Sequence, residues 1–142
     1  MSSRIARYAL SMLALASVAV LVAWFTWISP YGYRPPADLA PIDPDREHRV
    51  FVYGTLRQPI VRRLVTGQWI ATREAELAGF TQRGLDLEPQ PGATTEGEVF
   101  EVEAPVLARL DRYERLGIRY ERVEARLTGG NKAWVYLRLP VE

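Results

Sequence analysis

The sequence predicts an α+β domain, rich in short strands and with one main helix, preceded by a single transmembrane helix. Three observations support this prediction. A run of 21 residues near the amino terminus holds 18 apolar residues and no charge. Several later runs alternate apolar residues with polar or charged ones, as half-buried strands do. One further segment gathers its apolar residues on a single helical stripe.

The composition excludes several kinds of site. The chain has 142 residues, enough for one domain, with no cysteine and a single histidine, His48. Disulfide scaffolds, thiol nucleophiles and cysteine-ligated zinc are therefore excluded, and several histidines cannot meet at a metal within one chain. A Ser-His-Asp triad is disfavoured. The net charge of +1 gives no electrostatic reason to expect a nucleic acid partner.

The apolar run Tyr8–Ile28 is predicted to cross a membrane. At about 1.5 Å per residue such a helix is about 31 Å long, which matches a hydrocarbon core of about 30 Å. Its far end is aromatic, and aromatic rings favour the bilayer interface. Two alternatives stay open. A cleaved secretory signal usually has a shorter apolar core and ends in small residues, and a buried core helix is the other alternative.

The charges that flank this run predict its orientation. Arg4 and Arg7 precede it, whereas Asp38, Asp43 and Asp45 follow it. Because basic residues concentrate on the cytoplasmic side, the amino terminus is expected in the cytoplasm. The rest of the chain is then expected outside it, on an inner or plasma membrane.

A proline-rich segment, residues 29–47, separates the membrane run from the domain. It contains five prolines and has no periodic apolar pattern. This composition predicts an extended, semi-rigid spacer. We therefore divide the chain into an amino-terminal flank with the transmembrane helix (1–28), a linker (29–47) and a domain (48–142).

The domain opens with a strand and a short helical turn. Arg49–Tyr53 is a β-branched and aromatic run closed by Gly54, which predicts a strand followed by a turn. Ile60–Leu64 follows Pro59 and predicts a helical turn that ends near Gly67.

Further strands follow along the chain. Ala75–Phe80 alternates weakly, a polar loop with Pro and Gly is expected over Glu88–Thr95, and Gly97–Val102 predicts a half-buried strand. The runs 123–127 and 133–139 alternate clearly and are joined by a Gly-Gly-Asn turn, which predicts a hairpin.

The main helix is predicted over Pro105–Leu116. Pro105 suits the first turn, where its missing N–H has no cost, and Gly117 suits the position after the last turn. At about 100° per residue, the apolar side chains fall in one stripe about 120° wide. The members of this stripe are Val106, Leu107, Leu110 and Tyr113.

Glu114 is an exception on this helix because it lies within the apolar stripe, about 20° from Leu107 around the axis. A carboxylate turned toward a core is unfavourable unless it is paired or protonated, and burial raises its pKa. A raised pKa brings a glutamate close to neutrality for proton transfer. The alternative is a structural acid that bonds a nearby arginine, such as Arg122, or a tyrosine.

The segment Val50–Arg57 resembles the opening motif of the gamma-glutamylcyclotransferase-like superfamily, an apolar strand that runs into Tyr-Gly-Thr/Ser-Leu. The similarity continues in family order over about residues 49–139, and it includes a Leu-Asp-x-x-Glu motif that ends at Glu114. The other matching segments are Ala75–Phe80, Gly97–Val102, Tyr120–Arg122 and Ala133–Tyr136. The resemblance implies a small mixed β-barrel with one main helix.

This resemblance also implies an activity. Characterised members of the family convert a gamma-glutamyl amide or peptide to 5-oxoproline and a free amine. The substrate's own α-amino group attacks its γ-carbonyl, so no protein nucleophile, metal or cofactor is needed. Glu114 matches the catalytic glutamate and is expected to act as general acid and base. We therefore expect a membrane-anchored enzyme for a small gamma-glutamyl compound.

The family's substrate-binding residues match five positions here. The loop after the first strand resembles the site of the substrate carboxylate, since successive backbone N–H groups can cradle an anion. Two tyrosines match residues that line the pocket. These substrate-binding positions are Tyr53, Gly54, Thr55, Leu56 and Tyr120. Arg57 is expected to be solvated, and Arg122 to form an ion pair.

Two other kinds of function remain open for this domain. The domain could be a binding module that uses the same pocket without catalysis, or a purely structural membrane-anchored domain. The segment after the loop, Gln58-Pro59-Ile60-Val61, departs from the family and leaves the choice of substrate open. The oligomeric state is not predicted.

Three other polar residues are expected to be solvent-facing, and Asp111 is expected to fix the last helical turn or a loop. The solvent-facing residues are His48, Glu98 and Glu101.

Overall fold

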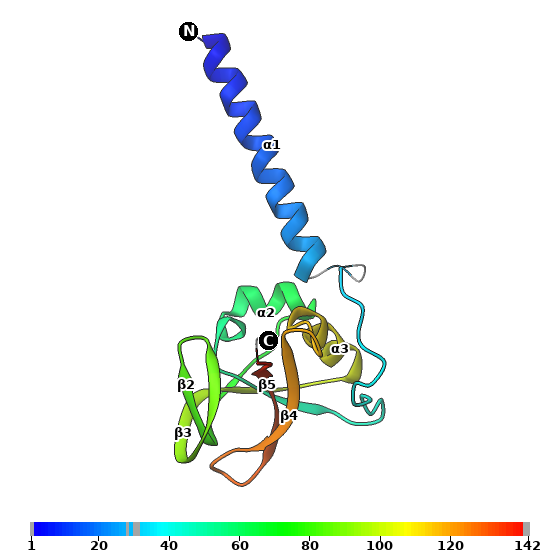
Figure 1. Ribbon diagram of the computed structural model, residues 1–142, viewed down its shortest axis with the longest axis vertical. Helices are drawn as coiled ribbons and strands as arrows, with labels where there is room; N and C mark the ends of the chain where they lie inside the picture. Colours follow the sequence, from blue (N-terminus) through cyan, green and yellow to red (C-terminus); the bar gives the residue numbers. More distant parts are fainter. Residues whose placement is uncertain (1, 28, 30–31, 141–142) are drawn as a thin grey trace. The chain divides into compact units, whose positions relative to one another are not determined.

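The computed structural model describes residues 2–27, 29 and 32–140, which form two compact units. The first unit extends to Arg34 and the second begins at Pro35. The first contains one long helix, and the second contains a sheet with shorter helices (Figure 1).

Helix α1 (Ser2–Trp27) is the apolar helix that the sequence predicts. It starts six residues before the predicted run, and Ile28, the last residue of that run, lies outside the described residues. Its stretch Arg4–Thr26 has a mean hydropathy of 2.1 and none of it is buried. By length and composition this helix can cross a membrane; that it does so stays a prediction.

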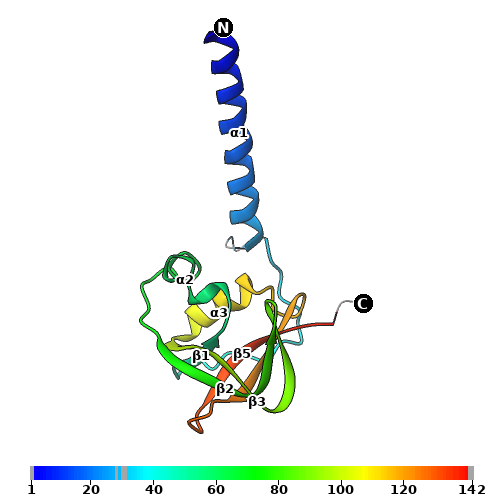
Figure 2. The same cartoon turned by 90° about the vertical axis from the view of Figure 1, so that its left-hand side faces the viewer.

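The second unit is an α+β domain built on one five-stranded sheet. Figure 2 shows it turned by 90° from the view of Figure 1. The strand order is β2-β3-β1-β5-β4, and every neighbouring pair is antiparallel except β1 and β5. The elements in chain order are β1 (His48–Val52), the 3₁₀ helix η1 (Thr55–Arg57), α2 (Pro59–Thr66), β2 (Arg73–Arg83), β3 (Asp86–Val102), α3 (Ala104–Tyr113), β4 (Tyr120–Arg126) and β5 (Lys132–Arg138).

The predicted barrel is wrong, because the sheet does not close. Its edge strands, β2 and β4, approach each other at a single bridge between Leu77 and Leu127, where the Thr128 N–H also donates to the Glu76 carbonyl at 2.9 Å. No further bridge between β2 and β4 occurs in the described residues, and the chain turns toward β5 directly after Leu127. The sheet is therefore strongly curled but open.

The two faces of the β4–β5 hairpin have different roles. Ala133 and Val135 point into the hydrophobic core, which also contains Phe51 and Leu77. The alternate side chains of β5 point to the other face, where Tyr136 is also buried. This alternation is the one that the sequence predicts. Residues on the second face contact α3 and carry the polar groups described below.

The predicted loop at Glu88–Thr95 is wrong, because these residues belong to β3. Their pairing with β2 is irregular: Ala78 pairs with Thr94, but Phe80 pairs with Pro89. One residue of β2 therefore faces a four-residue excursion of β3, residues 90–93. Prolines in strands are confined to edges and such irregularities, because they lack an N–H donor. The composition indicated the excursion but not the strand on either side of it.

Helix α3 ends earlier than predicted. It begins at Ala104 and ends at Tyr113, with Glu114 as its C-cap. The next residue, Arg115, has a left-handed backbone with φ of 53°. This conformation breaks the helix and is unfavourable for a residue with a Cβ. The chain therefore turns immediately after Glu114.

The linker segment from Pro35 onwards groups with the domain and makes contacts to it. Arg122 Nη2 donates to Ala40 O at 3.2 Å, and His48 Nε2 lies 2.8 Å from Asp43 O. His48 is only 2% exposed, so the expectation of an exposed histidine is wrong. The indole of Trp134 donates to His48 Nδ1 at 3.2 Å, so a neutral ring would carry its own proton on Nε2 and donate to Asp43.

Candidate active site

Helix α3 is fixed to the β4–β5 ladder through Asp111. The Tyr136 hydroxyl donates to Asp111 Oδ1 at 2.6 Å, and Arg122 Nε lies 3.3 Å from the same oxygen. Tyr136 and Arg122 are register partners across the ladder. All three side chains are largely buried, and the Arg122 guanidinium also lies over the Trp134 ring, 4.7 Å from its centroid. Asp111 therefore fixes α3 to the sheet, whereas the sequence predicted that it would fix the last helical turn or a loop.

Glu114 follows Asp111 by three residues and lies within electrostatic reach of Tyr120, whose register partner is Arg138, two positions along the ladder from the Arg122–Tyr136 pair. Its backbone N–H completes α3 by donating to Leu110 O at 2.9 Å. The turn at Arg115 then returns the chain to β4, and the Gly117 N–H donates to the Tyr120 carbonyl at 2.7 Å. The helix end and the strand start are thus joined by one tight connection.

The Glu114 carboxyl is half-buried, and burial raises its pKa to about 7. The positive charge of Arg119 lowers this pKa, but by less than burial raises it. Arg122, the partner that the structural alternative requires, forms its ion pair with Asp111 instead. Among the described residues, the Glu114 carboxyl has no hydrogen bond or ion pair. It is therefore able to take up and release a proton near neutral pH.

Two tyrosines of the predicted site lie within the electrostatic reach of Glu114. The Tyr53 hydroxyl donates to Tyr136 O at 3.0 Å. Burial raises the pKa of Tyr53, and the charges of Glu114 and Asp86 raise it further. Burial likewise raises the pKa of Tyr120, with the same two acids adding to the effect. Both hydroxyls therefore keep their protons at neutral pH and can donate hydrogen bonds.

The predicted binding loop, Gly54–Leu56, approaches α3 from the end of β1. The hydroxyls of Thr55 and Tyr113 lie 3.3 Å apart, and Tyr113 immediately precedes Glu114. The Arg57 N–H donates to Gly54 O at 3.0 Å, which closes the 3₁₀ turn. The first N–H groups of such a turn have no partner within it. The loop can thus present backbone donors next to the end of α3.

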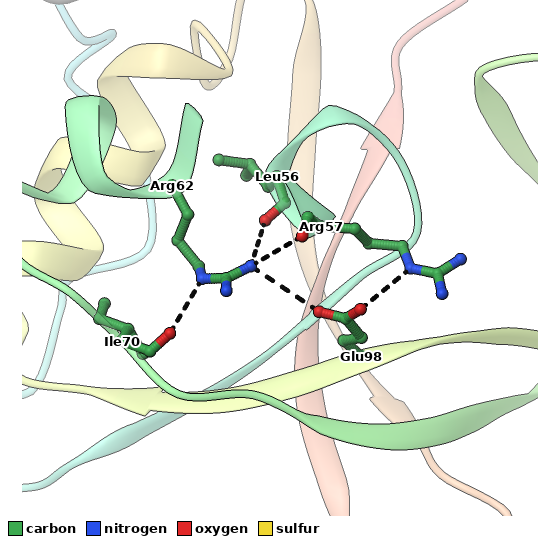
Figure 3. Close-up of polar contacts among 5 residues, drawn as sticks. All are labelled: Leu56, Arg57, Arg62, Ile70 and Glu98. Carbon is green, nitrogen blue, oxygen red and sulfur yellow. Dashed lines mark hydrogen bonds and ion pairs between the residues drawn. The ribbon is translucent and has the colours of Figure 1, made fainter. Parts of the chain in front are cut away.

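A buried arginine that sequence reasoning missed holds this loop in place (Figure 3). Arg62 Nη1 donates to Leu56 O at 2.8 Å and to Arg57 O at 3.1 Å, and its Nε donates to Ile70 O at 3.2 Å. The only sequence signal was an arginine within a short amphipathic turn. Its three backbone acceptors come from two separate loops, which the local pattern does not reveal.

Glu98 lies below the same loop, and the expectation that it is solvent-facing is wrong (Figure 3). Its carboxylate is 3.7 Å from Arg62 Nη1 and 3.5 Å from Arg57 Nε. The side chain of Glu98 is 20% exposed, whereas that of Arg57 is 45% exposed, in keeping with the predicted solvated position. Glu101 is more exposed and pairs with Arg49 at 2.6 Å. Glu98 is thus half-buried, and Glu101 is a surface carboxylate.

Asp86 is the second residue that the sequence did not single out. It opens β3, and its Oδ2 lies 3.2 Å from Arg138 Nη1. Arg138 is the register partner of Tyr120, and the charge of Asp86 contributes to the raised pKa of that tyrosine. No group of three or more His, Cys, Asp or Glu side chains suited to a metal ion occurs in the described parts of the chain.

Comparisons with known proteins agree with this architecture. A family model described as "Gamma-glutamyl cyclotransferase, AIG2-like" matches residues 50–142, more than half of the chain. A search of curated proteins finds no significant match.

Similar solved structures have low sequence identity to the chain. One is a protein of Arabidopsis thaliana determined in solution, with 27% identity, a TM-score of 0.56, and coverage of 68% of this chain and 72% of that one. An AIG2-like protein from Mus musculus has 23% identity, a TM-score of 0.53 and coverage of 68% and 80%. A protein named gamma-glutamyl cyclotransferase has 18% identity, a TM-score of 0.56 and coverage of 68% and 69%. The last two likenesses concern the fold alone. With the family match and the shared fold together, the chain belongs to the gamma-glutamyl cyclotransferase, AIG2-like family.

Proposed function

We propose that this protein is a membrane-anchored cyclotransferase that releases 5-oxoproline and an amine from a gamma-glutamyl amide or peptide. The observation that carries the proposal is the state of Glu114. Its carboxyl has a pKa raised to about 7 and no partner among the described residues, and it lies beside two protonated tyrosines. A purely structural acid would be expected to have a partner, as Asp111 has.

The reaction removes two protons from the α-nitrogen, protonates the departing amine and needs no protein nucleophile. Glu114 takes a proton from the substrate α-ammonium, and the neutral nitrogen attacks the γ-carbonyl carbon. Protonated Glu114 gives this proton to the amine as the bond to the amine breaks, and the ring nitrogen loses its second proton to the Glu114 carboxylate and from there to solvent, which leaves the neutral lactam. A group with a pKa near 7 suits both steps, because it is neither too weak a base nor too weak an acid.

The remaining residues hold the substrate in a folded conformation. The Gly54–Leu56 loop would bind the α-carboxylate through its backbone N–H groups, since such groups form anion cradles. Tyr53 and Tyr120 would line the pocket on either side of Glu114. Holding the α-nitrogen against the γ-carbonyl gives a proximity contribution to the rate. Arg62 supports this arrangement by fixing the loop carbonyls.

The test is turnover by the full-length protein in detergent. A panel of gamma-glutamyl dipeptides and gamma-glutamyl amines is incubated with the protein, and 5-oxoproline release is measured. Glu114→Gln keeps the shape of the side chain but removes its titration, so we expect a loss of at least about 100-fold. Glu103→Gln, an exposed glutamate at the other end of α3, is the matched control and should retain activity.

The outcomes separate the alternatives. Loss of activity in Glu114→Gln but not in Glu103→Gln supports the enzyme. Turnover that is equal in both variants contradicts the role of Glu114. Binding of gamma-glutamyl compounds without turnover by the wild-type protein favours a non-catalytic binding module that uses the same pocket.

A further inference from the structure

The outward face of helix α2 is apolar. Ile60 and Leu64 are 68% and 62% exposed. At about 100° per residue, these two side chains lie about 40° apart around the helix axis, on the side opposite to the residues that α2 buries. The buried residues are Arg62, Val65 and Thr66. A surface helix normally turns polar residues toward water, so this face reverses the usual pattern.

The segment around α2 is also aromatic and basic. Trp69, in the loop that follows the helix, is 71% exposed. Residues 54–73 include four arginines and no acidic residue. Carboxylates of β3 offset part of the charge of Arg57 and Arg73, and the local balance stays positive. Exposed apolar and aromatic side chains among arginines are typical of elements that lie in the interfacial region of a bilayer.

The connection between α1 and the domain is short. The domain begins at Pro35 and α1 ends at Trp27, so only residues 28–34 join them. Even a fully extended chain spans at most about 29 Å between these two Cα atoms. The membrane that α1 is proposed to cross is therefore the one extended apolar surface that the chain itself keeps within reach of the domain. The inference rests on this anchoring part of the proposed function.

This connection reaches the domain at the end that carries α2. Pro36 and Leu39 lie against Gly117, in the turn that follows α3. Helix α2 packs on α3, where Arg109 Nη1 donates to Thr66 O at 2.8 Å. Both helices lie at one end of the domain and the turn between β4 and β5 lies at the other, in both views (Figure 1, Figure 2).

We propose that the outward face of α2 docks on the surface of the membrane that α1 crosses, with Ile60 and Leu64 in the interfacial region of the bilayer. The neighbouring arginines can reach lipid phosphates while their stems stay on the apolar side. One eight-residue helix has little apolar area, but the tether makes its encounter with the bilayer intramolecular. The inner face of the same helix carries Arg62, which fixes the Gly54–Leu56 loop.

A fluorescent label on α2 tests the docking in the full-length protein. Because the chain has no cysteine, Leu64→Cys and Thr128→Cys each provide one site for a nitrobenzoxadiazole maleimide. The labelled proteins are reconstituted in vesicles of phosphatidylcholine with a minority of phosphatidylglycerol, with or without lipids that carry a nitroxide near the headgroup. We expect the nitroxide to quench the label at position 64. The label at position 128, exposed beside the β4–β5 turn, should not be quenched.

Two substitutions separate docking from mere proximity to the bilayer. Ile60→Ser removes an exposed apolar side chain, so the fold should be kept. It should lower the ratio of quenched to unquenched label at position 64, read from fluorescence lifetimes, by about tenfold. Gln58→Ser is the matched control and should leave the ratio unchanged, because the Gln58 side chain is polar and makes no capping bond.

Three results would overturn the docking. They are equal quenching at positions 64 and 128, a ratio that Ile60→Ser does not change, and a label at position 64 that is shielded from water but not quenched by lipid. The last result would indicate a contact between two copies of the chain.

An alkaline wash of the vesicles distinguishes the docking from the anchor. Protein that stays in the washed vesicles with an unquenched label at position 64 keeps the anchor and overturns the docking. Protein that the wash releases, but whose label was quenched before the wash, supports the docking and contradicts the anchor. Turnover of gamma-glutamyl compounds is measured separately and tests the enzyme alone.

Discussion

Arg122 forms its ion pair with Asp111, Nε to Oδ1 at 3.3 Å, and no cation of the described residues is in ion-pair contact with Glu114, three residues further along the chain. Two acids on one helix thus have different roles. Asp111 is bonded by a tyrosine and an arginine and joins α3 to the sheet. Glu114 is half-buried at the C-cap of the same helix, and its carboxyl has no hydrogen bond or ion pair within the described parts of the chain.

The stability of the protein should depend on pH through Glu114. Its pKa is about 7 in the folded protein against 4.5 for the ordinary group, so the folded state binds the extra proton between these values. Folding stability should therefore fall as the pH rises from about 4.5 to 7, by up to about 3 kcal/mol. Below pH 4.5 both states are protonated and this contribution to the pH dependence ends.

Glu114→Gln isolates that contribution, because the amide does not ionise. The variant should be more stable than the wild type at pH 8, and the difference should shrink toward pH 4.5. Urea unfolding of both proteins at a series of pH values in the same detergent measures it. A pH-independent difference in stability would mean that the Glu114 pKa is not raised.

The pH dependence of catalysis should report the same raised pKa of Glu114. The base form of Glu114 is needed to accept the ammonium proton, so kcat/KM should rise with pH along a limb centred near 7. An ordinary, solvated carboxyl would place this limb near 4.5. The measurement is the pH profile of 5-oxoproline release at low substrate concentration. A profile that is flat between pH 5.5 and 8 would argue against Glu114 as the base.

Removing the charge of Asp111 should destabilise the domain strongly. Asp111→Asn leaves the Arg122 guanidinium, whose side chain is 2% exposed, buried without its anionic partner. We expect a loss of about 3 kcal/mol in unfolding free energy. Tyr136→Phe removes only the hydrogen bond to Asp111 and keeps the ion pair, so its cost should be smaller, about 2 kcal/mol. A cost of Asp111→Asn that is no larger than that of Tyr136→Phe in urea unfolding would contradict this ordering, and a cost near zero would show that the ion pair contributes nothing.

Local patterns were sufficient to predict the parts of the molecule that depend on one segment. The angular position of Glu114 indicated an acid on the apolar side of the helix, and alternation indicated the β4–β5 hairpin. The β1 strand and its Gly-containing loop were also predicted from a short run. Each of these features is determined by side-chain periodicity within about ten residues.

The features that were missed depend on residues far apart in the sequence. Arg62 is recognised as a loop clamp only when the carbonyls of Leu56 and Ile70 are placed around it. Asp86 is paired with Arg138, which is 52 residues away in the sequence. His48 is buried because the preceding linker and Trp134 cover it. Closure of the barrel was expected from family resemblance, but the turn at Leu127 ends the edge contact after one bridge.

The contacts between Arg62 and the Gly54–Leu56 loop predict that substitution of Arg62 affects KM more than kcat. Lysine at position 62 keeps the charge but cannot donate to three carbonyls at once, and it loses the contact of the guanidinium with the Phe100 ring. Arg62→Lys should therefore raise KM by about tenfold, with a smaller effect on kcat, because the loop binds the substrate carboxylate. Arg73→Lys, an exposed arginine after the same loop region, is the matched control. A change in kcat alone would place Arg62 in a different role.

The membrane topology can be tested directly because the chain has no cysteine. Asp38→Cys places a single thiol at an exposed position of the segment beyond α1. With the amino terminus in the cytoplasm, a membrane-impermeant maleimide should label this thiol in intact cells or spheroplasts, and Leu85→Cys, at the tip of the β2–β3 hairpin, should be labelled equally. Labelling of either thiol only after permeabilisation would reverse the orientation.

An alkaline wash of the membrane fraction tests whether α1 is an anchor or a cleaved signal. An anchor predicts that protein of full-length mass stays in the washed membranes, whereas a signal peptidase would remove the residues of α1 and release the domain.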